Sequence, residues 1–373
     1  MNFLKEIKAL AKAYKSQLYG FFYGVDDHLS VELKLFYLHQ LNALCILAMD
    51  SPYDLCKIVK EPFQMLEKLI NEPKYRHSTI PKKKGGFREI YAPGKRLKRT
   101  QKCLNYFLQA HYLWIRPKEV HGFVINPHYK GPYCNIAENA RAHIGKKHVL
   151  NIDLKDFFPS ITARQVKALF LSPYFDYDEQ MATALTLLTT FEGKLPTGAP
   201  TSPVISNFIC LQLDKDIIDF CLSNNLTYTR YADDLTFSSD AKISDDEILD
   251  LINIIHKNKF RINGKKLYLR TSNQRQVVTG LTVNEKVNVD RKLLKQIRAM
   301  SHDLSRNGLE AATAKHFKIR SDCSAKDQSK FIDRLQGYIN FVGQIRGKED
   351  PVFLRMKKET IEAVKVNLSK TPR

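Results

Sequence analysis

Three aspartates in this chain have the type and spacing that metal-assisted phosphoryl chemistry requires. Asp153 ends an apolar run, and Asp233 and Asp234 stand together 80 residues later. Their oxygens are hard ligands that suit Mg²⁺, and two such ions can activate a hydroxyl and stabilise a leaving pyrophosphate. An Asp-Asp pair alone is more typical of a solvated turn, so the surrounding elements must decide between these interpretations.

The elements around the aspartates are predicted to bring them together. Threonines and aromatic residues alternate on both sides of the Asp233-Asp234 pair, which predicts a β-hairpin over 227–239 with the pair at its turn. The apolar run before Asp153 predicts a buried strand. Intervening helices allow the strand and the hairpin to lie in one sheet, so we expect the three carboxylates to converge at its edge.

No other catalytic pattern competes for the role of active site. The sequence holds no histidine–cysteine cluster, no Ser-His-Asp arrangement, no Walker A loop and no G-x-G-x-x-G motif. Its seven cysteines are scattered without a C-x-x-C pair, so we expect reduced thiols. The N-terminus carries early charge, unlike a signal peptide, and the apolar run 35–49 is too short to span a bilayer. We therefore expect a cytoplasmic protein without a membrane partner.

The charge of the chain indicates a polyanionic partner. The 373 residues are 43% hydrophobic, enough for a substantial core and two or three domains, and they carry a net charge of +20. Basic residues concentrate between 82 and 99, where Glu89 is the only acidic residue, on two strands predicted around Gly85-Gly86. Such strands suit contact with phosphates. A merely solvated basic surface is the alternative.

The remaining sequence predicts mostly helices. Helical segments are predicted over 1–70, over much of 100–145, from Ala163, and over 179–191, 204–222, 245–257 and 289–373. A rigid loop is predicted at 195–203 and a short strand pair around 260–266.

Residues from about 75 to 340 resemble a reverse transcriptase, because four motifs follow the order and spacing of that family. Tyr231-Ala-Asp-Asp234 resembles its Y-x-D-D box, 151–160 its first aspartate motif, 198–203 its nucleotide-binding loop and 82–88 its fingers. The resemblance implies an α/β (α+β) right-hand polymerase fold with helices behind an antiparallel palm sheet. Its expected regions are a helical N-terminal extension (1–70), fingers with part of the palm (71–150), the palm (151–288) and a helical, RNA-binding thumb (289–373).

The same resemblance implies an RNA-directed DNA polymerase with two-metal nucleotidyl transfer and assigns site residues. Asp153, Asp233 and Asp234 are expected to hold two Mg²⁺ ions (Mn²⁺ is an alternative), with the Leu154 carbonyl as an added ligand. The residues implied to bind dNTPs are Lys82, Lys83, Arg88, Phe158, Thr197, Gly198 and Lys266. Among them, the guanidinium of Arg88 is a planar fork of donors suited to a triphosphate.

Three of these assignments have alternatives. Phe158 matches an aromatic residue that excludes a ribose 2′-hydroxyl, but it can also pack in the core beside Phe157. Lys266 matches a lysine near the pyrophosphate, or else faces solvent. Thr197 stands where many members of the family have glutamine, and its shorter hydroxyl reaches less far toward a nucleotide.

Two further segments resemble signatures of bacterial retron reverse transcriptases. They are Asn139-Ala-x-x-His143 and Val278-Thr279-Gly280, and the named residues become candidates for RNA binding. For His143 the alternative is a capping or core histidine. Basic residues of 289–373 are also candidates to recognise an RNA stem, with a solvated face as the alternative. They are Lys292, Lys295, Arg298, Arg306, Lys315, Lys318 and Arg320.

The retron resemblance implies a dedicated biological role. The expected partner is a cognate structured noncoding RNA, which is primed from a 2′-hydroxyl and copied into branched multicopy single-stranded DNA. Anti-phage defence with a separate effector protein is implied, and removal of the template would fall to a host RNase H. The rival readings are a reverse transcriptase of group II intron or abortive-infection type, and a nucleoprotein scaffold that restrains an effector.

Overall fold

The structure, a computed structural model, describes residues 2–24, 28–82, 85–125, 134–319 and 322–369. The chain forms two compact units. The first contains residues up to 135 together with 150–237 and 243–268, and the second contains 136–149, 238–242 and 269–373. The division falls between residues 149 and 150 and between 237 and 238, within two of the strands of the sheet, and each unit is described by itself.

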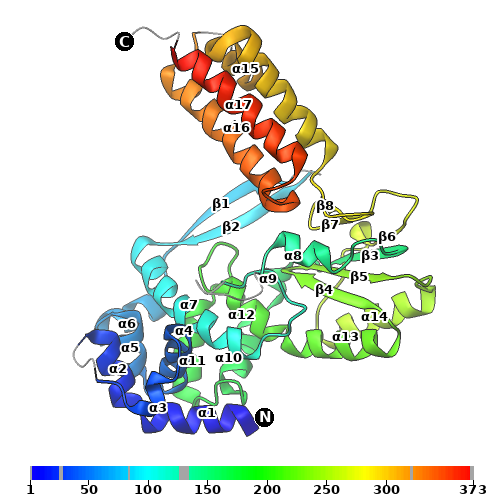
Figure 1. Cartoon of the computed structure of the whole chain (residues 1–373). Helices are drawn as coiled ribbons and strands as arrows, with labels where there is room; N and C mark the ends of the chain where they lie inside the picture. Colours follow the sequence, from blue (N-terminus) through cyan, green and yellow to red (C-terminus); the bar gives the residue numbers. More distant parts are fainter. Residues whose placement is uncertain (1, 25–27, 83–84, 126–133, 320–321, 370–373) are drawn as a thin grey trace. The chain divides into compact units, whose positions relative to one another are not determined.

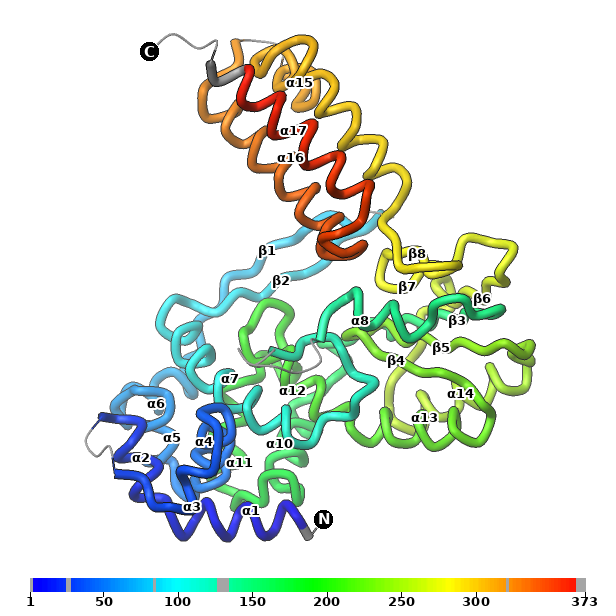
Figure 2. The backbone as a smooth tube through the Cα atoms, in the orientation of Figure 1, coloured from blue at the N-terminus to red at the C-terminus, as the bar shows by residue number. Residues whose placement is uncertain are grey.

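The first unit opens with short helices packed around one apolar helix. They are α1 (Asn2–Ala13), α2 (Lys15–Tyr23), α3 (Val31–Lys34), α4 (Leu38–Leu47), α5 (Pro52–Val59) and α6 (Phe63–Asn71). In α4 every residue from Leu41 to Leu47 is buried. This helix packs against α7 (Lys95–Ile115), the long helix that follows the basic hairpin (Figures 1 and 2). The prediction of a helical N-terminal segment is therefore confirmed, and the segment shares its core with the rest of the unit.

A buried carboxylate ties the N-terminal helices to α7. The Glu61 side chain is fully buried and accepts hydrogen bonds from Arg96 Nη2 at 2.8 Å and Arg99 Nη2 at 3.0 Å. These interactions keep the pKa of Glu61 below its usual value, although burial alone would raise it.

The basic hairpin consists of β1 (Tyr75–Pro81) and β2 (Phe87–Pro93), paired antiparallel. The aspartates lie on a second sheet with the strand order β4-β5-β3-β6. Its strands are β3 (His148–Asp153), β4 (Thr227–Tyr231), β5 (Asp234–Ser239) and β6 (Tyr268–Thr271). Helices α13 (Leu211–Ser223) and α14 (Asp245–Lys257) lie side by side below β4 in Figure 1. The mixed helix-and-sheet class that the sequence predicts is confirmed.

Among its described residues, this unit contains four further helices, and two predictions for it are wrong. The helices are α9 (Phe157–Ser160), α10 (Ala163–Leu171), α11 (Glu179–Thr189) and α12 (Ser202–Ile209). The single helix predicted over 204–222 is wrong, because α12 and α13 are separated at Cys210, where ψ is −4°. The strand pair predicted around 260–266 is also wrong. Ile262 makes one bridge to Leu154, and Gly264–Lys266 then form a 3-10 turn.

The second unit is built on three long helices. They are α15 (Arg291–Phe317), α16 (Ala325–Arg346) and α17 (Pro351–Ser369), which run alongside one another in Figure 2. Helix α15 is interrupted at Gly308, whose φ is +82°. The same apolar core takes in α8 (Ile136–Arg141) and the short hairpin of β7 (Val277–Val278) and β8 (Leu281–Thr282). No helix among the described residues combines the length and the apolar character needed to cross a membrane.

Candidate active site

The strand ends bring the three aspartates to one edge of the sheet. Asp153 is the last residue of β3, Asp233 lies in the turn after β4, and Asp234 is the first residue of β5. The backbone N–H of Leu154 donates to the carbonyl oxygen of Asp233 at 2.9 Å, which joins the end of β3 to the hairpin turn. The predicted hairpin and strand are both present, and the sheet places their carboxylates together.

Two side chains from the segment after α14 hold the Asp153 carboxylate. Lys266 Nζ donates to Asp153 Oδ1 at 2.6 Å, and Asn263 Nδ2 donates to Oδ2 at 3.3 Å. The backbone N–H of Asn263 also donates to the Asp153 carbonyl at 2.8 Å. Sequence reasoning assigned Lys266 but missed Asn263, although the Asn-Gly pair that starts the 3-10 turn was a visible signal.

Burial and like charge act together on the aspartate pair. Burial, followed by the charge of Asp153, raises the pKa of Asp233, against the opposing charges of Lys266 and Arg88. The Asp234 side chain is exposed to solvent on one side. Partial loss of hydration and then the charges of Asp233 and Asp153 nevertheless raise its pKa to about 7. This cluster of negative charge is poorly compensated by the protein alone.

The donor set suits a hard divalent cation. The side chains at the edge offer carboxylate oxygens, without thiol or imidazole, which is the set that Mg²⁺ prefers. Within the described ranges, no group of three or more His, Cys, Asp and Glu side chains has the spacing of a formed metal site. Lys266 instead supplies the positive charge next to Asp153. The residues thus fit a divalent metal in chemistry, with one carboxylate currently paired to an ammonium group.

Phe158 lies on the short helix that follows the first aspartate. Its ring stacks on Phe123, with ring centroids 5.6 Å apart and ring planes at 28°. The centroid of the Phe157 ring lies 5.5 Å from that of Phe158. Phe157 is 5% exposed and packs on Phe260, whereas Phe158 is partly exposed. The core position therefore belongs to Phe157, and the Phe158 side chain remains partly exposed to solvent.

The basic hairpin supplies positive charge to the same unit. Arg88 lies on β2 with an exposed side chain, and its charge acts on Asp233. Lys82 precedes the turn of the hairpin, where its N–H donates to the Gly86 carbonyl at 2.8 Å. Lys83 falls outside the described residues. Of the two predicted cations that the structure describes, Arg88 is the one whose charge lowers the pKa of Asp233.

The loop at 195–203 is docked onto β2. The N–H of Tyr91 donates to the Thr197 carbonyl at 2.7 Å. Gly198 adopts φ +119°, and a Cβ there would stand 3.0 Å from the Tyr91 carbonyl oxygen. Only glycine accommodates both the backbone angle and the close approach, so Gly198 serves to dock the loop.

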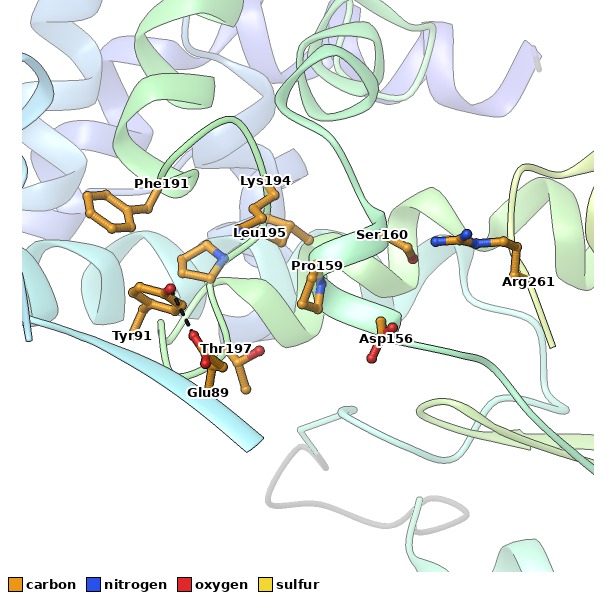
Figure 3. Close-up of a pocket in the computed structure, with 11 residues that line it drawn as sticks. Glu89, Tyr91, Asp156, Pro159, Ser160, Phe191, Lys194, Leu195, Thr197 and Arg261 are labelled. Carbon is orange, nitrogen blue, oxygen red and sulfur yellow. Dashed lines mark hydrogen bonds between the residues drawn. The ribbon is translucent and has the colours of Figure 1, made fainter. Parts of the chain in front are cut away.

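A cavity of about 380 Å³ opens between β2, this loop and α9 (Figure 3). Thr197 lies on its wall, and the Tyr91 hydroxyl donates to Glu89 Oε2 at 3.1 Å. Its other lining residues are Asp156, Pro159, Ser160, Phe191, Lys194, Leu195, Pro196 and Arg261. Phe158 is not part of the lining, so α9 presents Pro159 and Ser160 to the cavity.

The two retron-like segments lie together in the second unit. Thr279 and Gly280 form the two-residue turn of the β7–β8 hairpin, with φ of +47° and +83°. The Thr279 hydroxyl donates to the Ile136 carbonyl at 3.1 Å, at the start of the helix that carries Asn139. The turn at Thr279 therefore helps to hold the N-terminal end of α8, the helix that carries Asn139.

Several of these candidates are buried. Asn139, His143 and Val278 are fully buried, and His143 Nδ1 lies 2.7 Å from the Ser238 hydroxyl. Buried side chains cannot touch a ligand at the surface, so these three are not available for the direct RNA contact that the sequence suggested. Lys295 and Arg298 are exposed on α15, whereas Arg320 falls outside the described residues.

Comparison with known proteins identifies the family. The reverse transcriptase (RNA-dependent DNA polymerase) family matches residues 80–331. The retron Ec86 reverse transcriptase of Escherichia coli is 33% identical over 273 residues, covering 71% of this chain and 81% of that protein. The retron Mx65 reverse transcriptase of Myxococcus xanthus is 33% identical over 247 residues, which is 61% of this chain and 55% of that protein.

A further retron relative and one solved structure were also found to be similar to the chain. The retron Ec73 reverse transcriptase of Escherichia coli is 32% identical over 295 residues, covering 74% of this chain and 83% of that protein. Among solved structures, telomerase from Candida albicans in complex with a fragment of telomeric RNA gives a TM-score of 0.45 at 10% identity, over 82% of this chain and 65% of that one. On the sequence matches, the chain belongs to the reverse transcriptase family, and within it to the bacterial retron type.

Proposed function

We propose that this chain copies an RNA template into DNA by adding dNTPs to a primer at the edge formed by Asp153, Asp233 and Asp234. The observation that carries the proposal is the convergence of these three carboxylates with Lys266 and Asn263 at one sheet edge. The family match supports the same reaction. The +20 net charge of the chain suits a polyanionic template.

We further propose that two Mg²⁺ ions bind to the three aspartates and the Leu154 carbonyl. Bound there, the metal would lower the pKa of the attacking hydroxyl and stabilise the leaving pyrophosphate. The raised pKa values of Asp233 and Asp234 support the proposal, because clustered carboxylates at neutral pH call for a compensating cation.

The chain's own residues position the substrate. Although partial burial opposes it, the hydrogen bond to Asp153 raises the pKa of Lys266, so this side chain stays charged and is suited to the pyrophosphate side. Arg88 and Lys82 on the hairpin supply donors for the triphosphate. Phe158 stands against a ribose 2′-hydroxyl, and Gly198 with Thr197 forms the floor under the nascent base pair. In this scheme residues 71–150 act as fingers, 151–288 as palm and 289–373 as thumb.

The biological role is proposed from the retron relatives. We propose that the protein binds a cognate structured RNA in the cytoplasm, starts synthesis from a 2′-hydroxyl and makes branched multicopy single-stranded DNA. A separate effector protein, a host RNase H and a role in anti-phage defence complete this proposal. Nucleic acid extracted from cells that carry the gene with its flanking DNA tests it. A single-stranded DNA joined to RNA by a 2′,5′ branch supports the proposal, and the absence of any such DNA contradicts it.

The exposed basic face of α15 is proposed to recognise the RNA. Replacing Lys295 and Arg298 with alanine removes two phosphate contacts, so we expect affinity for the cognate RNA to fall about tenfold at physiological salt. The slope of log affinity against log salt should become shallower by about 1.5. Filter binding across a salt titration measures both quantities. The matched control is alanine at Lys326 and Lys330 on α16, which removes the same charge. An unchanged slope for the α15 variant would argue against this surface.

The raised pKa of Asp234 predicts a pH-dependent stability. With a folded pKa of about 7, this group binds more protons in the folded than in the unfolded protein between roughly pH 4 and 7. Stability should therefore fall as pH rises through that window. We expect the thermal midpoint of the metal-free protein to drop between pH 5 and 8 by about 3 °C more than that of Asp234→Asn. Mg²⁺ added at pH 8 should offset the loss in the wild type alone. Parallel calorimetric curves for the two proteins would contradict the assignment.

A further inference from the structure

A buried ion pair lies directly beneath the catalytic turn. Arg230 on β4 and Asp214 on α13 are both fully buried. Arg230 Nε donates to Asp214 Oδ1 and Nη2 to Oδ2, each at 2.7 Å, and the Tyr228 hydroxyl donates to Oδ1 at 2.8 Å. Burying two charges is unfavourable even when they are paired, and apolar residues of similar volume often serve stability equally well. Stability alone therefore does not explain why the chain buries this ion pair.

The third nitrogen of the guanidinium reaches the turn itself. Arg230 Nη1 donates to the Ala232 carbonyl at 3.2 Å and to Asn207 Oδ1 at 3.0 Å. Ala232 precedes Asp233 and adopts a φ of +60°, a left-handed conformation that residues other than glycine rarely take. The guanidinium thus binds the peptide group that leads into the first aspartate of the hairpin.

The opposite side of the turn is closed by glycine backbone. Asn207 Nδ2 donates to the Gly122 carbonyl at 3.0 Å. A Cβ on Gly122 would lie only 2.2 Å from the Ala232 nitrogen, so no side chain fits at this position. The neighbouring backbone runs along β4, where Arg230 N donates to the Glu119 carbonyl at 3.0 Å and His121 N donates to the Arg230 carbonyl at 2.9 Å.

We infer that Arg230, held by Asp214 and Asn207, is a positioning residue for Asp233. Its Nη1 fixes the orientation of the Ala232–Asp233 peptide and keeps Ala232 left-handed, which aims the Asp233 carboxylate at the sheet edge. Arg230 itself touches neither substrate nor metal. The inference rests on the proposed function, because it assigns the network to the same site.

A double variant separates positioning from stability. Asp214→Leu with Arg230→Met replaces the ion pair by apolar side chains of similar length, so the thermal midpoint should stay near that of the wild type. The donor to the Ala232 carbonyl is lost, and we expect the single-turnover rate of dNTP addition to fall about 10- to 100-fold. The concentration of dNTP at half-maximal rate should change little. A wild-type rate at a wild-type midpoint would overturn the inference.

Arg230→Lys provides the second variant in case the double variant does not fold. It keeps the charge beside Asp214 but lacks the fork that reaches Ala232, so a similar loss of rate is expected. Arg346→Lys is the matched control, because Arg346 also makes a nearly buried pair, with Asp350, on α16. This control should keep the wild-type rate, and an equal loss in both lysine variants would overturn the inference.

Metal affinity provides a readout that does not depend on turnover. Mn²⁺ binding, followed by electron paramagnetic resonance, should weaken about tenfold in Arg230→Lys and stay unchanged in Arg346→Lys. If the wild type adds no nucleotide to any primer, the proposed function fails, and the Mn²⁺ affinities still decide on positioning. If the wild type is active and both the rate and the Mn²⁺ affinity of Arg230→Lys match it, only the positioning role is refuted.

Discussion

Replacing Asp233 with asparagine is expected to lower the rate of dNTP addition by about three orders of magnitude. Asparagine has nearly the same shape but lacks the charge that a divalent cation requires. The fold should tolerate the change, because the hydrogen bond that ties the turn to β3 uses the backbone carbonyl of Asp233. Primer extension on an RNA template measures the rate, and calorimetry verifies the thermal midpoint.

The control for this variant is Asp219→Asn. Asp219 is an exposed carboxylate on α13, so its loss changes the net charge by the same amount away from the catalytic edge. We expect this control to extend primers at the wild-type rate. A normally active Asp233→Asn protein would show that the catalytic centre lies elsewhere, and the branched DNA should be absent from cells that carry this variant.

Replacing Phe158 with valine is expected to reduce discrimination against ribonucleotides by about 10- to 100-fold. The smaller side chain leaves room where a 2′-hydroxyl would otherwise clash with the ring. Because Phe157 fills the core position and Phe158 is partly exposed, the fold should be retained. The measurement is the ratio of kcat/KM for a dNTP to that for the matching NTP.

Two further variants serve as controls for Phe158→Val. Phe158→Tyr keeps an aromatic ring on Phe123 and should preserve most of the discrimination. Tyr106→Val shortens a half-exposed aromatic side chain on α7, and it should leave the ratio unchanged. If Phe158→Val keeps the wild-type ratio, the ring packs on its neighbours without acting on the sugar.

Local patterns in the sequence predicted the elements that hold the aspartates. The threonines and aromatic residues around Asp233 were enough for the hairpin, because β-branched and aromatic residues favour strands. Helix α14 was predicted with its observed ends, since Ser244 and Glu247 form a capping box and acidic residues fill the first turn. Such signals lie within a few residues of each other, so a single sequence contains them.

Apart from the convergence of the three aspartates, contacts between distant segments were not predicted. Arg230 stands in a strand pattern as an ordinary basic residue, and nothing near it reveals that Asp214 is its partner across the fold. The role of Gly122 depends on a backbone from 110 residues further along the chain. Asn263 was predicted only as part of a short strand pair, which the structure does not show. Tertiary packing decides these interactions, and neither periodicity nor propensity encodes it locally.

The burial of α4 has a consequence for how the chain is made. Its apolar surface is covered by α7, about 50 residues later, and the Tyr177 hydroxyl donates to the Ile46 carbonyl from 131 residues away. At a synthesis rate of about 5–20 residues per second, α4 leaves the ribosome several seconds before its covering segments exist. The apolar surface of α4 is therefore exposed in the nascent chain during that interval. We expect chaperones that hold exposed apolar segments to improve its yield, and slow translation between residues 47 and 95 to favour aggregation.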